Sequence, residues 1–99
     1  MELTSKQRAH LRSLAHHLKP LVQVGQAGVG DAALRTVEEA FSNRELLKVK
    51  VLENAPEDPR ETADRIVAAL DGVHVAQTIG RTIVLYRQHP ENPEIRLPR

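Results

Sequence analysis

Three glycines fall within six residues of the stretch VGQAGVGDA, which runs from Val24 to Ala32. An apolar run precedes the stretch and an amphipathic helical pattern follows it, so it is expected to join a strand to a helix. Glycine-rich turns of this kind can bring backbone N–H groups close to a bound anion, because no side chain blocks the approach. The candidate ligands are a nucleotide, a dinucleotide and the sugar-phosphate backbone of a nucleic acid.

Residue type and order exclude both nucleotide loops. A P-loop, G-x-x-x-x-G-K-[ST], needs a lysine for the phosphates and a hydroxyl for Mg²⁺ after its second glycine. In this chain Gly30 is followed by Asp31 and Ala32, so the cation is missing and a carboxylate stands in its place. The dinucleotide fingerprint G-x-G-x-x-G appears here in reversed order, and 99 residues leave no room for a doubly wound sheet.

The remaining candidate is a G-x-x-G loop made of Gly25, Gln26, Ala27 and Gly28. Such a loop can approach a sugar-phosphate chain closely, as the clamp of KH domains does, and the following helix start also favours an anion. By itself the motif is weak, since glycine marks ordinary turns as well. A bulky or acidic side chain at Gly28 is expected to weaken RNA binding while leaving the fold largely intact.

Helix signals occur at three places. Thr4 and Gln7 form a capping box ahead of an apolar stripe that Pro20 ends, with Leu11, Leu14, Ala15 and Leu18 in the stripe. A second stripe over residues 33–41 is expected to end near Asn43. A third helix is expected to start at Asp58-Pro59-Arg60-Glu61, with Asp58 as its N-cap, and to stop at Asp71-Gly72.

Four strands are expected between and after these helices, at residues 21–24, 46–52, 73–79 and 82–87. The order α-β-α-β-α-β-β predicts parallel crossovers and a final antiparallel hairpin that turns at Gly80-Arg81. The fold class is therefore α/β with an α+β character: one domain over residues 1–90, in which three helices pack on a mixed four-stranded sheet. Residues 91–99 are expected to form an extended tail over the surface.

Charge is distributed unevenly, although the net charge is only +1. No acid lies between Leu3 and Gly30 or between Gly72 and Pro90, whereas acids gather from Glu53 to Asp64. This polarity favours an anionic partner, although charge runs can also be no more than solvated faces. Cysteine is absent, the N-terminus is polar and no apolar run could span a bilayer, which indicates a soluble, cytoplasmic protein.

Several basic residues are candidates for phosphate contacts. Lys6, Arg12 and Lys19 fit that role and an ordinary solvated role equally well. Lys48 and Lys50 point to one side of their strand, which favours an open basic face over stems that cover apolar surface.

The remaining side chains indicate neither a metal site nor catalysis. The histidines His10, His16 and His17 lack a carboxylate nearby in the sequence and suggest surface groups that add charge in mild acid. Phe41 is assigned to the core and Tyr86 to its edge, so little base stacking is expected. No nucleophile-base pair is visible. The sequence therefore predicts a protein that is not an enzyme and has no cofactor.

Longer segments resemble a known family. The opening TSKQRAHLRSLAHHLKPLVQVGQAG, the strand ELLKVKV and the closing IGRTIVLYR are similar to the CRM domain (chloroplast RNA splicing and ribosome maturation) in its free-standing bacterial, YhbY-like form. The likeness runs in order from about Leu3 to Arg87. It implies a fold similar to the C-terminal domain of bacterial translation initiation factor three. It also implies RNA binding through the G-x-x-G loop and neighbouring basic surface.

The resemblance carries over residue by residue and has two departures. Gly25 and Gly28 match the loop glycines, and the basic positions of the matching strands are Lys48, Lys50, Arg81 and Arg87. Gln26-Ala27 supplies no cation at the tip of the loop. Gly30 stands where family members often have a threonine or similar cap, so either Gly30 or Asp31 must cap the second helix.

Together these features predict a non-catalytic RNA-binding protein. The resemblance adds ribosomal RNA in precursors of the large ribosomal subunit as the target, and we expect a monomer. The alternative is an adaptor that docks a ribosomal or translation protein through the acidic residues 57–64. The predicted RNA-binding residues are Lys6, Arg12, Lys19, Gly25, Gln26, Ala27, Gly28, Lys48, Lys50, Arg81 and Arg87.

Overall fold

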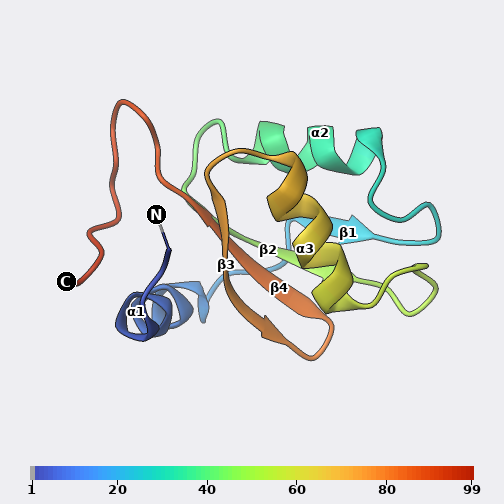
Figure 1. Cartoon of the computed structure of the whole chain (residues 1–99), viewed down its shortest axis with the longest axis horizontal. Helices are drawn as coiled ribbons and strands as arrows, with labels where there is room; N and C mark the ends of the chain where they lie inside the picture. The colour runs from blue at the N-terminus through green and yellow to red at the C-terminus, as the bar shows by residue number, and fades with distance from the viewer. Residues whose placement is uncertain (1) are drawn as a thin grey trace.

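Figure 1 shows a computed structural model of the chain, which describes residues 2–99. The elements follow the predicted order: α1 (Ser5–Ala15), β1 (Val22–Val24), α2 (Asp31–Ala40), β2 (Leu46–Val51), α3 (Pro59–Ala69), β3 (Val73–Ile79) and β4 (Thr82–Arg87). The four strands form one mixed sheet in the order β1-β2-β4-β3. The predicted architecture is therefore confirmed.

The pairing of the strands determines which of their ends lie together. β1 runs parallel to β2, with Gln23 opposite Lys50, and β2 runs antiparallel to β4, with Lys50 opposite Thr82. β3 is the second edge strand and pairs antiparallel with β4, with an irregularity between Val75 and Gln77. A bulge of this kind discourages pairing with another chain at the exposed edge. The C-terminal ends of β1 and β2 therefore meet the β3–β4 turn at one end of the sheet.

The helix starts have the local chemistry that the sequence predicts. At α1 the Thr4 hydroxyl accepts from the Gln7 N–H at 3.1 Å, and the Gln7 side chain accepts from the Thr4 N–H at 3.0 Å. At α3 the Asp58 carboxylate accepts from the Glu61 N–H at 2.8 Å. Each bond satisfies an N–H that the helix itself leaves unpaired. α2 differs, because its N-cap is Gly30 and no side chain caps it.

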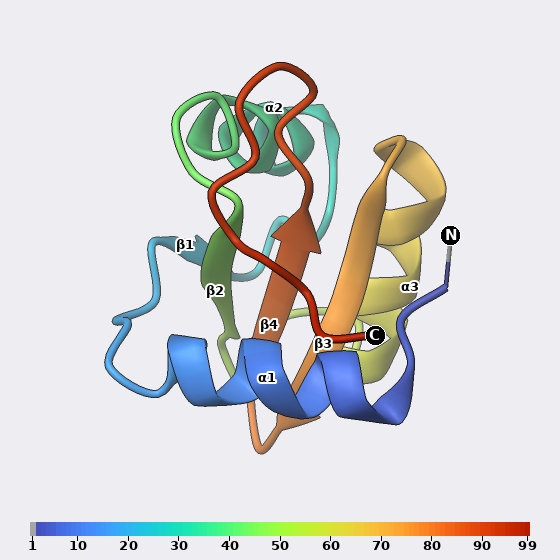
Figure 2. The same ribbon diagram turned by 90° about the vertical axis from the view of Figure 1, so that its left-hand side faces the viewer.

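A hydrophobic cluster packs on each face of the sheet. α2 and α3 cover one face, where Val37 and Ile66 pack onto inward residues of the strands such as Val49. α1 crosses the other face, where Leu11 and Ala15 pack against Val84 and other strand residues. Figure 2 shows α1 in front of the sheet and the C-terminal tail crossing the same face beside it. The sheet is thus the middle layer of three.

Two helices end earlier in the chain than the sequence predicts. α1 stops at Ala15 rather than near Pro20, and the Leu18 N–H closes a turn onto the Ala15 carbonyl at 2.9 Å. Leu14 is 41 % exposed and Leu18 39 %, so only part of the predicted stripe is buried. The helix crosses the sheet and touches it mainly through Leu11 and Ala15, which leaves its flanking leucines in solvent. α2 likewise ends at Ala40 rather than near Asn43.

The C-terminal tail is fastened to the domain by Glu45. The Glu45 side chain is buried, and its carboxylate accepts from the N–H groups of His89, Glu94 and Ile95 at 2.6, 2.8 and 2.8 Å. Ile95 and Leu97 pack against the cluster under α1. Burial alone would raise the pKa of the Glu45 carboxyl, but these N–H groups and nearby His89 hold it below its ordinary value. Nothing in the sequence pattern singled out this residue.

We predict that Glu45→Gln lowers the free energy of unfolding by about 2 kcal/mol, because three partly buried N–H groups lose an ionised acceptor. The carboxylate is more acidic in the folded than in the unfolded chain. Its contribution is therefore complete above the ordinary pKa of 4.5 and is lost as the pH falls below it through the folded value. Urea unfolding at pH 7 and in steps down to pH 3 measures both effects. Equal pH profiles for the variant and the parent chain would contradict this role of Glu45.

Candidate nucleic-acid interface

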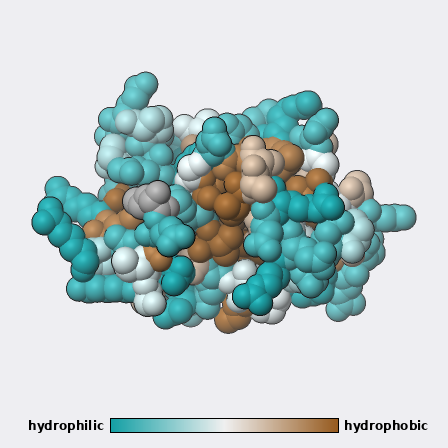
Figure 3. Space-filling view, viewed as in Figure 1, coloured by the Kyte–Doolittle hydropathy of each residue, from teal (hydrophilic) through white to brown (hydrophobic). Residues whose placement is uncertain are grey.

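Three connections meet at one end of the sheet: the β1–α2 loop, the β2–α3 loop and the β3–β4 turn (Figure 1). The Leu52 N–H donates to the Val24 carbonyl at 2.8 Å, and the Val51 N–H donates to the Arg81 carbonyl at 2.8 Å. In Figure 3 hydrophobic residues gather in the middle of the visible face, whereas the end that carries these loops is mainly hydrophilic. This loop end is therefore the first candidate for a polar ligand.

The G-x-x-G segment forms a tight turn at the loop end. The Gly28 N–H donates to the Gly25 carbonyl at 2.9 Å, which leaves Gln26 and Ala27 exposed at the tip. Gly28 is buried and has a φ of 70°, in the left-handed region that favours glycine. The backbone of the tip is therefore held in one conformation and faces solvent.

The fold constrains the two glycines of the motif differently. A Cβ at Gly28 would lie 2.8 Å from Cγ of Pro56 and 3.2 Å from the Glu57 carboxylate. A Cβ at Gly25 would make only ordinary contacts, at 3.5 Å to Leu52 and 3.7 Å to Asn54. The expectation that a larger residue at Gly28 leaves the fold largely intact is therefore wrong, since the turn packs directly on Pro56.

A hollow of about 390 Å³ separates this turn from the start of α2. Gly25 and Gly28 line one side of it, and Gly30 to Ala33 line the other. The first N–H groups of α2 have no side-chain cap, and the dipole of the helix adds partial positive charge there. Asp31 is the first residue of the helix, so it supports the helix start and also places a carboxylate in the hollow. An anion would have to bind through backbone groups and tolerate that charge.

Lys48 and Lys50 lie on the face of the sheet that α1 partly covers. Lys50 is exposed and sits opposite Gln23, near the end of β1. Lys48 is half-buried, and its Nζ donates to the Leu18 carbonyl at 3.0 Å, which ties the α1–β1 connection to the sheet. The face is thus neither fully open nor fully covered: Lys50 keeps its charge in solvent, whereas Lys48 also holds a loop.

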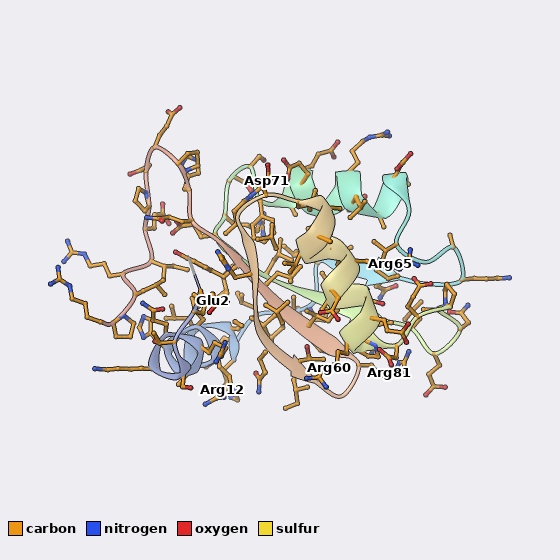
Figure 4. All side chains as sticks on the ribbon, viewed as in Figure 1. Glu2, Arg12, Arg60, Arg65, Asp71 and Arg81 are labelled. Atoms are coloured by element: carbon orange, nitrogen blue, oxygen red, sulfur yellow. The ribbon has the colours of Figure 1, made fainter. Side chains whose placement is uncertain are left out.

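Arg81 stands in the β3–β4 turn, where Figure 4 labels it beside the loop end. Its Nε donates to the Val51 carbonyl at 2.7 Å and its Nη2 to the Leu52 carbonyl at 2.8 Å. These bonds fix the end of β2 to the hairpin. Arg81 is therefore at the predicted place, but much of its hydrogen-bonding capacity serves the fold.

Arg87 lies at the other end of β4, about 20 Å from Arg81 at the usual rise of a strand. Its guanidinium donates to the Asp71 carbonyl, pairs with the Glu38 carboxylate and stands 5.8 Å from the centre of the Phe41 ring. Figure 4 labels Asp71 at this opposite end. The structure thus separates Arg87 from the other candidates and uses it to join α2 and the α3–β3 turn to the sheet.

The candidates on and after α1 are spread along the helix. Arg12 lines a groove of about 680 Å³ together with Lys48, while Lys6 is exposed in the first turn and Lys19 is exposed after the helix. Two further residues of this groove, Gln77 and Ile79 on β3, were not among the predicted site residues. Only the pairing of β3 with β4 brings them under α1, so their spacing in the sequence gave no signal.

Two ionisable side chains outside the loop end have a shifted pKa. Burial, and then the Glu45 carboxylate, raise the pKa of Tyr86, and burial lowers the pKa of His74. Neither group is at the loop end. Within residues 2–99 no cluster of three or more histidine or acidic side chains could hold a metal ion, and no helix could cross a membrane.

Comparisons with known proteins identify the family of the chain. The sequence model of the CRS1 / YhbY (CRM) domain matches residues 3–87. The chain is 48 % identical over 96 residues to the "Probable RNA-binding protein YqeI" of Bacillus subtilis, with 97 % of this chain and 99 % of that protein covered. It is 40 % identical over 97 residues to an "RNA-binding protein" of Haemophilus influenzae, which covers 98 % of this chain and 96 % of that one.

A solved structure has the same fold. The solution structure of the hypothetical protein SAV1595 from Staphylococcus aureus is 42 % identical to this chain and superposes with a TM-score of 0.81, covering 97 % of this chain and 99 % of that one. The family match spans all four strands and all three helices, including the G-x-x-G turn. The chain therefore belongs to the CRS1/YhbY (CRM) domain family.

Proposed function

We propose that this protein binds RNA at the loop end of its sheet, with the G-x-x-G turn against the sugar-phosphate backbone and Lys50 beside it. The observation that carries the proposal is the exposed Gln26-Ala27 tip, held in a hydrogen-bonded turn between two glycines and next to the start of α2, which no side chain of the described residues caps. Backbone N–H groups arranged in this way suit phosphate oxygens. The names of the Bacillus and Haemophilus relatives support RNA as the ligand.

The proposed target is ribosomal RNA in precursors of the large ribosomal subunit, bound in the cytoplasm by a monomer without any catalytic step. The choice of target rests on the resemblance to the free-standing bacterial members of the family. The lysines and the other arginines of the surface are not held in ion pairs, because the only ion pair within residues 2–99 joins Arg87 to Glu38. Lys50, Arg12 and Lys19 are all exposed.

The adaptor alternative has less support in the arrangement of charge. Arg60 and Arg65 are exposed on α3 among its acids, so the helix does not present a continuous acidic face. The Asp58 side chain is occupied as the N-cap. RNA binding is therefore the function that the surface favours.

Crosslinking in cells, followed by sequencing of the bound RNA, is expected to recover large-subunit ribosomal RNA. Binding in vitro should weaken steeply with salt, with a log-log slope of about −0.7 for each phosphate contacted on a single strand. Recovery of no RNA would refute RNA binding, and recovery of RNAs other than ribosomal RNA would refute the target. A slope near zero would argue against a phosphate clamp.

Ala27→Asp is expected to reduce RNA affinity at least fivefold, because it puts a carboxylate where the phosphate backbone approaches. Ala27 is exposed at the tip of a turn that tolerates aspartate, so the unfolding midpoint should stay unchanged. Ala68→Asp on α3 adds the same charge at another exposed alanine and serves as the matched control. Equal losses of affinity in the two variants would show a general charge effect and no clamp.

Gly28→Ala and Gly25→Ala separate the structural glycine from the ligand-facing one. Gly28→Ala should lower the free energy of unfolding by about 1–2 kcal/mol or more, because of its positive φ and the contact with Pro56. Gly25→Ala should leave stability nearly unchanged and weaken RNA binding, since its methyl group meets only ordinary contacts in the fold. Thermal unfolding and RNA titration of the two proteins test this, and equal stability of both would contradict it.

A further inference from the structure

We propose that the groove between α1 and the β3–β4 hairpin receives one unpaired nucleotide of the bound RNA, with its base against Ile79 and its phosphate near Arg12 and Lys48. This inference rests on the proposed function and adds a base-binding subsite to it. The groove is lined by α1 on one side and by residues of β2, β3 and β4 on the other. Its volume, about 680 Å³, falls within the range of about 300–1,000 Å³ that small ligands occupy.

The walls of the groove combine an apolar surface with free polar groups. Ile79 at the end of β3 is 59 % exposed, and Val84 and Ala15 form an apolar floor. The Gln77 amide lines the groove and makes no hydrogen bond within residues 2–99. An amide can donate to and accept from the edge of a base, while an aliphatic side chain covers the face of the base.

The charge of the groove suits a nucleotide rather than a neutral ligand. Arg12 from α1 and Lys48 from β2 line it, and none of its lining residues within the described part of the chain is acidic. Figure 4 shows Arg12 directed away from the body of α1, on the side toward the hairpin that carries Arg81. Lys50 follows Lys48 on the same face of β2, so basic groups continue from the groove toward the G-x-x-G turn.

The positions of the aromatic side chains also favour the groove as the site for a base. Phe41 and Tyr86 are buried, so neither can stack on a base. His16 and His17 are exposed, line the groove and pack edge to face with a centroid distance of 5.3 Å. Histidine rings are among the platforms that RNA-binding proteins use for unstacked bases. Stacking in this chain is therefore available at the groove that Ile79 also lines.

The test uses the whole protein and two RNA hairpins that differ only in a single-stranded overhang of six uridines. In the second hairpin the overhang has abasic sugars, so it keeps every phosphate and loses the bases. The parent chain should bind the uridine overhang at least about fivefold more tightly than the abasic one. Ile79→Ala and Gln77→Ala should each reduce that preference and leave the affinity for the abasic hairpin unchanged.

Val67→Ala is the matched control, because Val67 is an apolar side chain on α3 that is 37 % exposed and lies outside the groove. It should keep the full preference for the overhang that has bases. Lys50→Ala should weaken the binding of both hairpins equally. Equal binding of the two hairpins by the parent chain would overturn the subsite and leave the proposed function standing. An undiminished preference in the Ile79 and Gln77 variants would also overturn it. Binding of neither hairpin at low salt would overturn both proposals.

Discussion

The end of β2 is the point on which the arrangement of the loops depends. There the Val51 N–H donates to the Arg81 carbonyl, the Leu52 N–H donates to Val24, and the Arg81 side chain donates back to the carbonyls of Val51 and Leu52. These bonds link the parallel pair β1–β2 to the antiparallel pair β2–β4. Because β1 runs parallel to β2 and β4 runs antiparallel to it, the C-terminal ends of β1 and β2 and the β3–β4 turn lie at the same end of the sheet. The mixed topology itself therefore brings the G-x-x-G turn, the 52–58 loop and Arg81 together.

The two faces of the sheet are used differently as a result. α2 and α3 bury one face under a conventional apolar cluster, while α1 and the tail share the other. Glu45 makes this sharing possible, since its carboxylate satisfies three N–H groups of a segment that forms neither helix nor strand. The tail therefore covers the apolar residues near Leu3 and Tyr86, and the strand ends at Lys50 and Ile79 stay accessible beyond α1.

The sequence predicts the elements well because their signals are local. The Thr4 and Asp58 caps and the alternation in residues 46–51 are each contained within a few residues, and the structure has all of them. The positions that the sequence does not predict depend on partners far along the chain. The residues next to Arg87 in the sequence do not indicate that Asp71 and Glu38 bind its side chain. Those next to Gly28 do not indicate its contact with Pro56. Glu45 acquires its role only because residues 89–95 fold back against it. Side-chain type suggested RNA contacts for Arg81 and Arg87, whereas tertiary packing gives both a structural role.

By itself the G-x-x-G turn attracts an anion only weakly. Its tip carries no cation, Asp31 lines the adjoining hollow, and the Glu57 carboxylate lies close to Gly28. Backbone dipoles can orient a phosphate there, but the carboxylates of two nearby acids repel the negative charge of the phosphate. Under the proposed function, net attraction must therefore come from cations outside the turn, such as Lys50 opposite Gln23 and, in the groove under α1, Lys48 and Arg12. Under the proposed function, binding that takes its orientation from the turn and its attraction from separate cations weakens as the salt concentration rises.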